Sequence, residues 1–268
     1  MAGVTPPLPS FVCERFMLKI EHLTKIYDNG VKALDDVSFE VPDGQFVAII
    51  GLSGSGKSTL LRCINRLIEP TDGRILWNDI DITSANDEEL RLIRRRIGMI
   101  FQQFNLVKRS KVITNVLAGR LGYTNQFMSF INHFSKEDYE DALAKLERVG
   151  IADKADNRAD ELSGGQQQRV GIARALMQDP ELMLADEPVA SLDPATSHSV
   201  MKYLELLNKE DGISILCSLH FLSLARTYSD RVIALKDGRI EFDGPAQDID
   251  EVRFKEIYGE DAVRVEIE

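Results

Sequence analysis

The sequence predicts an α/β fold with a helical insertion, and three observations favour this class. Residues 46–50 form a wholly apolar run of strand length, as expected of a strand that is covered on both faces of a sheet. A second α/β unit is predicted nearer the C-terminus, with a helix at 194–208 between buried strands at 182–185 and 213–217. The stretch between these two parts, about residues 105–176, is mostly helical in pattern.

The first part of the chain is predicted to contain a leader, a set of short strands and one helix. Residues 1–16 are rich in proline, so we expect a flexible leader there. From residue 17 onward, short β-rich runs alternate with turn signals, at residues 18–20, 37–41, 46–50 and 75–77. Apolar residues at helical spacing from Leu60 to Ile68 predict a helix after the run at 46–50.

Capping and turn residues delimit the elements of the second part. Ser135, which is followed by acidic residues, is typical of a helix start, and Gly150 is expected to stop that helix. A Lys-Asp-Gly sequence predicts a hairpin turn between strands at 232–235 and 239–242. Residues 249–268 are expected to form a C-terminal tail.

The composition is that of a globular protein with an acidic balance. Of the 268 residues, 44% are hydrophobic and 28% are charged, which is enough for a full core and unlike a disordered or collagen-like chain. The 32 Lys and Arg residues against 43 Asp and Glu residues give a net charge of −11, which argues against a protein that wraps nucleic acid. No stretch approaches the ~20 apolar residues needed to cross a bilayer, so we expect no membrane span.

The clearest chemical motif is the sequence GLSGSGKS at residues 51–58, which fits the pattern G-x-x-x-x-G-K-[ST]. Glycines let the backbone wrap so that successive N–H groups point at a phosphate, and the helix that follows adds the positive end of its dipole. In this pattern Lys57 is placed to contact the β- and γ-phosphates, and the Ser58 hydroxyl is placed to ligate Mg²⁺. The motif therefore predicts a phosphate site for a nucleotide.

Two adjacent carboxylates, Asp186 and Glu187, follow the predicted buried strand at 182–185. Such a strand delivers them to the carboxyl edge of a sheet, where ligands bind in α/β folds. We expect Asp186 to hold Mg²⁺, directly or through water, and Glu187 to be the general base toward the attacking water. His220 follows the predicted strand at 213–217, so it should leave the sheet at the same edge and contact the γ-phosphate.

The sequence LSGGQ at residues 162–166, together with the motifs above, resembles the ATP-binding cassette (ABC) ATPases. The resemblance extends over about residues 18–244. It implies a P-loop NTPase core of the RecA-like type with an antiparallel β subdomain and a helical subdomain at about 105–176. It further implies that residues 17–248 form a single ABC ATPase domain with ATP and Mg²⁺ as cofactors.

The resemblance also implies roles for individual residues. Gln102 matches the family's Q-loop glutamine, a catalytic residue and Mg²⁺ ligand, although the neighbouring Gln103 is an alternative. His220 matches the family's switch histidine. Tyr27 lies where the family stacks an aromatic ring on adenine, or it simply packs at a turn. The nucleotide contacts that the family implies fall on Tyr27, Gly51, Leu52, Ser53, Gly54, Ser55, Gly56, Lys57, Ser58, Thr59, Ser163, Gly164, Gly165, Gln166 and Asp193.

The LSGGQ motif also begins a predicted helix, with Ser163 as the N-cap residue. The N-terminus of this helix is a second site in the same chain that could bind a phosphate. One ATP cannot use both glycine-rich motifs of a single domain if they lie on opposite subdomains. The family's arrangement implies a head-to-tail dimer of two copies, in which each ATP lies between the phosphate loop of one copy and the LSGGQ of the other.

A single cassette without a membrane-spanning run resembles the separate ATPase subunit of a bacterial importer. The sequences FQQFNLV at 101–107 and ADEPVASLDP at 185–194 are similar to the phosphonate-import ATPase subfamily. The resemblance implies import of phosphonate or a related phosphorus oxyanion, driven by ATP hydrolysis. It implies two integral membrane permease subunits, an indirect solute-binding partner and a peripheral location at the cytoplasmic face of the membrane.

Two alternatives stay open. Amino-acid importers share much of the FQQFNL pattern, and a soluble ABC ATPase acting on nucleic acid or protein is a different class. The latter predicts two cassettes or a basic or coiled-coil insertion, so we expect no nucleic-acid partner. The stretch at 123–139 resembles the subfamily's insertion, and it is expected either to receive a membrane subunit or to belong to the helical core. Its apolar residues are Phe127, Met128, Phe130, Ile131 and Phe134.

Overall fold

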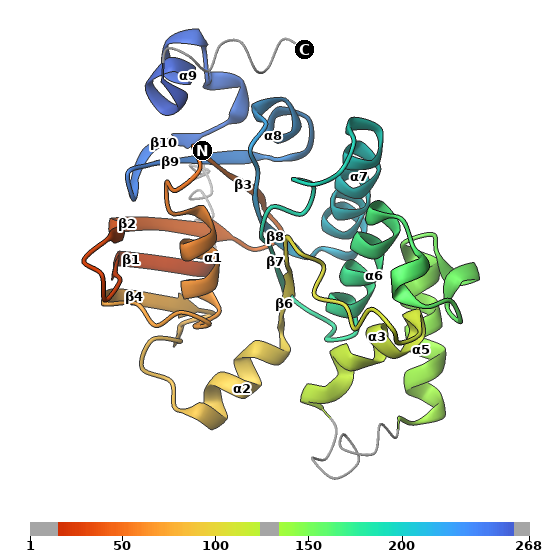
Figure 1. The fold of residues 1–268 in the computed structure, drawn as a ribbon. Coiled ribbons are helices and arrows are strands. Elements are labelled where there is room, and N and C mark those ends of the chain that lie inside the picture. The colour runs from red at the N-terminus through yellow and green to blue at the C-terminus, as the bar shows by residue number, and fades with distance from the viewer. Residues whose placement is uncertain (1–15, 124–133, 260–268) are drawn as a thin grey trace, which may run out of the picture.

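The computed structural model describes residues 16–123 and 134–259, which form two sheets with helices between and beside them (Figure 1). Four apolar residues of the insertion, Phe127, Met128, Phe130 and Ile131, lie outside the described residues, as do the leader at 1–15 and the end of the tail at 260–268. Phe134 is described, and it is buried in the core among the helices.

Four strands from the first part of the chain form an antiparallel sheet in the order β2-β1-β4-β5. Their bounds are β1 Phe16–Ile26, β2 Lys32–Pro42, β4 Asp72–Trp77 and β5 Ile80–Asp81. The runs predicted at 18–20, 37–41 and 75–77 lie within β1, β2 and β4. The strands are longer than predicted because the pairing of β1 with its two neighbours continues through polar residues such as Glu21 and Lys25.

Six strands form the central sheet in the order β10-β9-β3-β8-β7-β6. Five of them run parallel, and β10 pairs antiparallel with β9. Every residue of β3, β6, β7 and β8 is buried because both faces of this sheet are covered, as the apolar run at 46–50 predicted. The bounds are β3 Phe46–Ile50, β6 Ile97–Ile100, β7 Leu182–Ala185, β8 Ser214–Ser218, β9 Arg231–Lys236 and β10 Arg239–Gly244.

The alternation of side chains along β3 divides the core into two parts. Val47 and Ile49 point to the face that packs on helix α1, Lys57–Ile64, and on the antiparallel sheet. Phe46 and Ile50 point to the other face, which the remaining large helices cover. Helix α1 therefore lies between the two sheets, as Figure 1 shows.

The helical insertion is interrupted rather than continuous. Helices α3, α5 and α6 confirm the helical pattern predicted for 105–176, but residues 101–111 follow an irregular course. Among the described residues, no helix is both long and apolar enough to pass through a bilayer. The helices are α2 Asp87–Arg95, α3 Val112–Leu117, α5 Lys136–Arg148, α6 Gly164–Leu176, α7 Pro194–Asp211, α8 Leu222–Tyr228 and α9 Glu251–Tyr258, with 3₁₀ turns at Ala118–Gly122, Ala152–Lys154, Ala159–Glu161 and Ala246–Asp248.

Local chemistry explains the predicted start and stop of α5 and the predicted hairpin. The Ser135 side chain accepts from the backbone N–H of Asp138, whose carboxylate accepts from the Ser135 N–H in return. Gly150 follows the helix with φ of 68°, so the predicted stop is confirmed. Asp237 and Gly238 both have positive φ, 49° and 79°, as a tight hairpin turn between β9 and β10 requires.

The helix predicted from Leu60 to Ile68 is wrong at its C-terminal end, because α1 stops at Ile64. Arg66 adopts a left-handed backbone with φ of 47°. Its guanidinium donates to the carbonyl oxygens of Ile82 and Ala85 at 2.9 and 2.6 Å, which holds the chain in this turn. A long-range contact thus overrides the local helical pattern.

Candidate nucleotide-binding site

The central sheet brings three predicted site segments to one edge. Strands β3, β8 and β7 are parallel neighbours, so the segments that follow them leave at the same carboxyl edge. These segments are the phosphate loop after β3, the Asp186-Glu187 pair after β7 and His220 after β8. The prediction that these residues meet at one sheet edge is confirmed by the strand order.

The phosphate loop at residues 51–58 has the backbone that its glycines predicted. Gly51, Gly54 and Gly56 have φ of 141°, 82° and 108°, which side-chain-bearing residues rarely adopt. A Cβ atom at Gly51 would lie 2.1 Å from the carbonyl oxygen of Leu235, and one at Gly56 would lie 2.4 Å from that of Ala33. The close packing of the loop on its neighbours therefore requires glycine at these two positions.

Helix α1 begins at this loop with an N-terminus suited to an anion. Within the described residues, the Gly56 cap offers no side-chain hydrogen bond to the first N–H groups of α1. By contrast, α5, α6 and α7 are capped by Ser135, Ser163 and Asp193. Uncapped N–H groups and the positive end of the helix dipole attract a phosphate.

Lys57 lies buried at the centre of the loop, with 4% of its surface exposed. Its ammonium donates to the carbonyl oxygens of Gly51 and Leu52 at 2.8 and 3.0 Å and lies 4.0 Å from a Glu187 carboxylate oxygen. Burial lowers the pKa of Lys57, and the negative charges of Glu187 and Asp186 oppose that shift. A phosphate bound at α1 would supply a further anionic partner for this ammonium.

Asp186 and Ser58 meet at the loop, as predicted for Mg²⁺ ligands. The Ser58 hydroxyl donates to Asp186 Oδ1 at 2.6 Å, and Asp186 is only 1% exposed. Hydroxyl and carboxylate oxygens are the donors that Mg²⁺ prefers, and Mg²⁺ takes its other ligands from nucleotide phosphates and water. The donor set therefore fits this ion.

Glu187 is held against His220 and Ser218. Its Oε1 atom lies 2.7 Å from His220 Nε2, and its backbone N–H donates to the Ser218 hydroxyl at 2.8 Å. The backbone of Glu187 is left-handed, with φ of 48°. These contacts place a carboxylate, an imidazole and the Lys57 ammonium around one point at the sheet edge, which suits chemistry on a phosphoryl group.

The sequence prediction missed two residues of this cluster. Arg62 donates to Asp186 Oδ2 at 3.0 Å, and the Ser218 hydroxyl lies 3.3 Å from Asp186 Oδ1. Arg62 stands four residues after Ser58 on α1, so helical spacing was an available signal. Ser218 is a hydroxyl residue at the end of a buried strand, which was a weaker one.

Tyr27 and Gln102 are less tightly connected to the cluster. The Tyr27 hydroxyl lies 3.1 Å from Thr59 Oγ1, so this ring stands beside the start of α1. Gln102 and Gln103 are both exposed and follow β6, whose Ile100 is in register with Ala185 of β7. Gln102 thus lies beyond the same sheet edge, and exposure alone does not separate it from Gln103.

The LSGGQ segment lies away from the phosphate loop within one chain. Ser163 caps α6 with Gln166 as its reciprocal partner, which confirms the predicted helix start. Helix α6 packs on the sheet face opposite to the one that contacts α1. A Cβ atom at Gly165 would lie 2.1 Å from Thr196 Cγ2, so this segment packs against the start of α7, where Asp193 is the N-cap.

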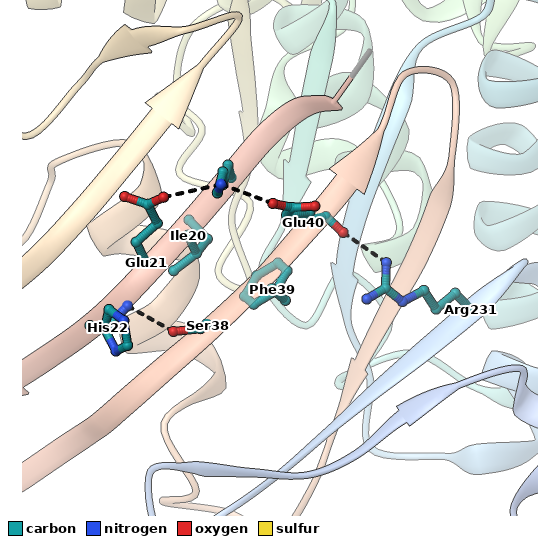
Figure 2. Close-up of a pocket in the computed structure, with 8 residues that line it drawn as sticks. Ile20, Glu21, His22, Ser38, Phe39, Glu40 and Arg231 are labelled. Atoms are coloured by element: carbon teal, nitrogen blue, oxygen red, sulfur yellow. Dashed lines mark hydrogen bonds and ion pairs between the residues drawn. The ribbon is translucent and has the colours of Figure 1, made fainter. Parts of the chain in front are cut away.

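A separate recess lies on the antiparallel sheet (Figure 2). Its charged groups pair with each other: Lys19 lies 3.2 Å from Glu21 and 3.1 Å from Glu40. Arg231 donates to the Glu40 carbonyl oxygen at 2.7 Å. Because these groups already satisfy one another, the recess is a weaker candidate than the sheet edge.

The chain is similar to known proteins along most of its length. The profile of the ABC transporter family matches residues 34–190. A phosphonates import ATP-binding protein of Bdellovibrio bacteriovorus is 54% identical over 247 residues, which cover 92% of this chain and 95% of the relative. One of Halalkalibacterium halodurans is 51% identical over 243 residues, or 91% and 94% of the two chains.

A solved structure shares the fold. It is a dimeric ATP-binding cassette in a post-hydrolysis state, bound to ADP and Pi. Its TM-score is 0.76 at 38% identity, with 86% of this chain and 99% of that chain covered. This similarity and the family match confirm the predicted P-loop α/β fold class.

Proposed function

The chain belongs to the ABC transporter family of ATP-binding proteins, and we propose that it hydrolyses ATP to drive import of phosphonate or a related phosphorus oxyanion. The observation that carries the ATPase proposal is the convergence of Lys57, Ser58, Asp186 and Glu187 at the N-terminus of α1. The solute is inferred from relatives named as phosphonates import ATP-binding proteins, which are 51% and 54% identical to this chain.

The positions of these groups support the following hydrolytic step. The N–H groups of the phosphate loop and the Lys57 ammonium bind the phosphates, and Tyr27 stacks on the adenine. A water oxygen attacks the γ-phosphorus as the bond to the β–γ bridging oxygen breaks, and ADP leaves with that electron pair. Glu187 takes a proton from the water, and His220, 2.7 Å from Glu187, contacts the γ-phosphate.

Ser58, Asp186 and Gln102 are the residues that would hold Mg²⁺. When bound, this ion neutralises charge that develops on the phosphate oxygens. Asp186 is anchored for this role by the Ser58 hydroxyl, at 2.6 Å, and by the Arg62 guanidinium, at 3.0 Å. The ligand atoms are thus oriented by contacts within the chain.

We propose that a second copy of the chain completes each ATP site. Residues Ser163, Gly164, Gly165 and Gln166 of one copy would contact the ATP that the other copy's phosphate loop binds, with Asp193 at the junction. The placement of α1 and α6 on opposite faces of the central sheet supports this arrangement. The two helices that follow the glycine-rich motifs of one chain lie on different sides of the sheet, so a second copy is needed to bring both motifs to one ATP.

Two membrane permease subunits and, through them, a solute-binding protein are the proposed partners. The chain would bind these subunits peripherally at the cytoplasmic face of the membrane, through the irregular segment that contains Gln102. We propose that residues 17–248 form one ATPase domain, with the leader before it and the tail after it.

The test measures ATP hydrolysis by the chain after co-expression with the permease and solute-binding subunits encoded beside it. The complex is placed in lipid for the assay. Methylphosphonate, phosphite, phosphate and an amino-acid mixture are added separately, with a Glu187→Gln complex as the hydrolysis-deficient control. We expect stimulation by methylphosphonate or phosphite. Stimulation by amino acids alone would instead identify an amino-acid importer.

Hydrolysis that no solute changes, by a chain that does not co-purify with an integral membrane protein, would favour a non-transport ABC ATPase. Hydrolysis that persists at the wild-type rate in the Glu187→Gln complex would contradict the assigned general base. The two results separate the transport proposal from the catalytic one.

A further inference from the structure

Ser218 connects both carboxylate residues of the site through one hydroxyl group. It is the last residue of β8, next to β7 in the central sheet (Figure 1), and it is fully buried. Its Oγ atom accepts from the Glu187 N–H at 2.8 Å and lies 3.3 Å from Asp186 Oδ1 and 3.5 Å from the Ala185 carbonyl oxygen. One side chain therefore touches three consecutive residues at the end of β7.

We propose that Ser218 is a positioning residue for ATP hydrolysis, which fixes the general base Glu187 relative to the metal ligand Asp186. This inference rests on the proposed function, because it assigns Ser218 a role only in orienting groups that act on ATP.

The hydrogen-bonding capacity of a hydroxyl supports this role. A serine has one proton to donate and lone pairs to accept with. Since a lone pair takes the Glu187 N–H, the proton is left for Asp186 Oδ1, which is nearer than the Ala185 carbonyl and carries charge. The hydroxyl thus spans the peptide unit that joins the two acidic residues.

The backbone of Glu187 makes this anchor necessary. Its φ of 48° lies in the left-handed region, which is unfavourable for a residue with a side chain. The backbone torsions set the direction in which the carboxylate leaves the chain, toward His220 Nε2 at 2.7 Å and Lys57 Nζ at 4.0 Å. Without the bond to Ser218, the N–H of Glu187 would lose the partner that holds this conformation.

The same strand contains a matched control. Ser214 is also fully buried, and its hydroxyl accepts from the Gly44 N–H at 2.7 Å. It lies at the opposite end of β8, where its contacts are with the turn before β3 and not with Asp186 or Glu187. Ser214→Ala therefore removes an equally buried hydroxyl bonded to a backbone N–H, and it leaves the acidic pair intact.

The experiment compares wild type, Ser218→Ala and Ser214→Ala in the complete transporter complex. It measures kcat and KM for ATP, equilibrium binding of ATP under non-hydrolysing conditions, and the midpoint of thermal unfolding. We expect Ser218→Ala to lower kcat on the order of 10- to 100-fold through misplacement of the base, with ATP affinity changed by less than about threefold. Ser214→Ala should lower the unfolding midpoint comparably and keep kcat within about twofold of wild type.

A wild-type kcat in Ser218→Ala would overturn the inference. So would a loss of kcat in Ser214→Ala equal to that in Ser218→Ala. A loss of ATP affinity in Ser218→Ala as large as its loss of kcat would also overturn it. If Ser218→Ala does not fold, Ser218→Cys serves the same comparison, because a thiol keeps nearly the same shape but is a weak acceptor. A wild-type kcat in that variant would equally refute the role. Absence of ATP hydrolysis by the wild-type complex would instead contradict the proposed function.

Discussion

Replacing Arg174 with methionine should loosen the irregular segment that contains Gln102. Arg174 lies on α6, and its guanidinium donates to the carbonyl oxygens of Phe104 and Asn105 at 2.9 and 2.6 Å. Both of these residues have a left-handed backbone, with φ of 50° and 49°. Burial lowers the pKa of Arg174, but a guanidinium stays charged at neutral pH. Methionine would keep an apolar stem of similar length and remove both donors.

The expected size of the effect follows from these contacts. A hydrogen bond from a charged donor contributes about 1.5–3 kcal/mol, so the pair contributes about 3–6 kcal/mol to this conformation. The left-handed backbone costs about 1–2 kcal/mol at Phe104 and less at Asn105, because asparagine adopts this region more readily. This backbone cost is the same with and without Arg174, so the change in opening is set by the two lost hydrogen bonds. We expect local opening to become easier by about 3 kcal/mol, the lower end of their contribution. That difference corresponds to roughly 100-fold.

Native-state hydrogen exchange of the peptide that spans residues 101–108 measures this opening. We expect exchange to be about 100-fold faster in Arg174→Met than in wild type. Arg169→Met is the control, because Arg169 lies on the same helix but its guanidinium donates to the Gly150 carbonyl oxygen at 3.5 Å. Exchange in Arg174→Met within about threefold of wild type would refute the reasoning.

Three further predictions test the candidate site. Glu187→Gln should keep ATP affinity and lower kcat by at least about 100-fold, because the water would lose its proposed general base. Parallel binding and hydrolysis assays check this, and a wild-type rate would contradict it. Ser163→Arg should leave ATP binding by the monomer intact and block the ATP-dependent dimer, which light scattering measures; a normal dimer would exclude the two-copy site. Gly56→Ala should lower the unfolding midpoint and the ATP affinity more than Gly54→Ala does. A Cβ atom at residue 56 would lie 2.4 Å from the Ala33 carbonyl oxygen, whereas one at residue 54 would have no atom within 4 Å. Equal effects of the two alanine variants would contradict this account of the loop.

The phosphate loop and the strand ends could be predicted because their signals are local. The glycines at 51, 54 and 56 adopt positive φ, and three glycines within six residues already predict a tightly wrapped loop. The buried strand at 182–185 and the serine caps of α5 and α6 depend on residues within a few positions of each other. The two adjacent carboxylates after β7 followed from the same pattern.

What the sequence could not predict depends on residues that are distant along the chain. Arg62 and Ser218 both contact Asp186, from positions 124 and 32 residues away. The early end of α1 likewise depends on Arg66 binding carbonyl oxygens of a later segment. Helical spacing could place Arg62 on the same side of α1 as Ser58. No local pattern, however, shows that Arg62 or Ser218 meets Asp186.

By itself, the sequence predicted which residues are candidates for phosphate and acid–base chemistry, and it determined which segments are buried strands. Only the tertiary structure decided that β8 lies between β3 and β7, and hence that Ser218 and His220 reach the acidic pair. It also placed α1 and α6 on opposite faces of the central sheet, which separates the two glycine-rich motifs within one chain. The physical reason is the range of each effect. Composition and residue spacing determine local structure over a few residues, whereas the order of the strands depends on how both faces of the whole sheet are covered.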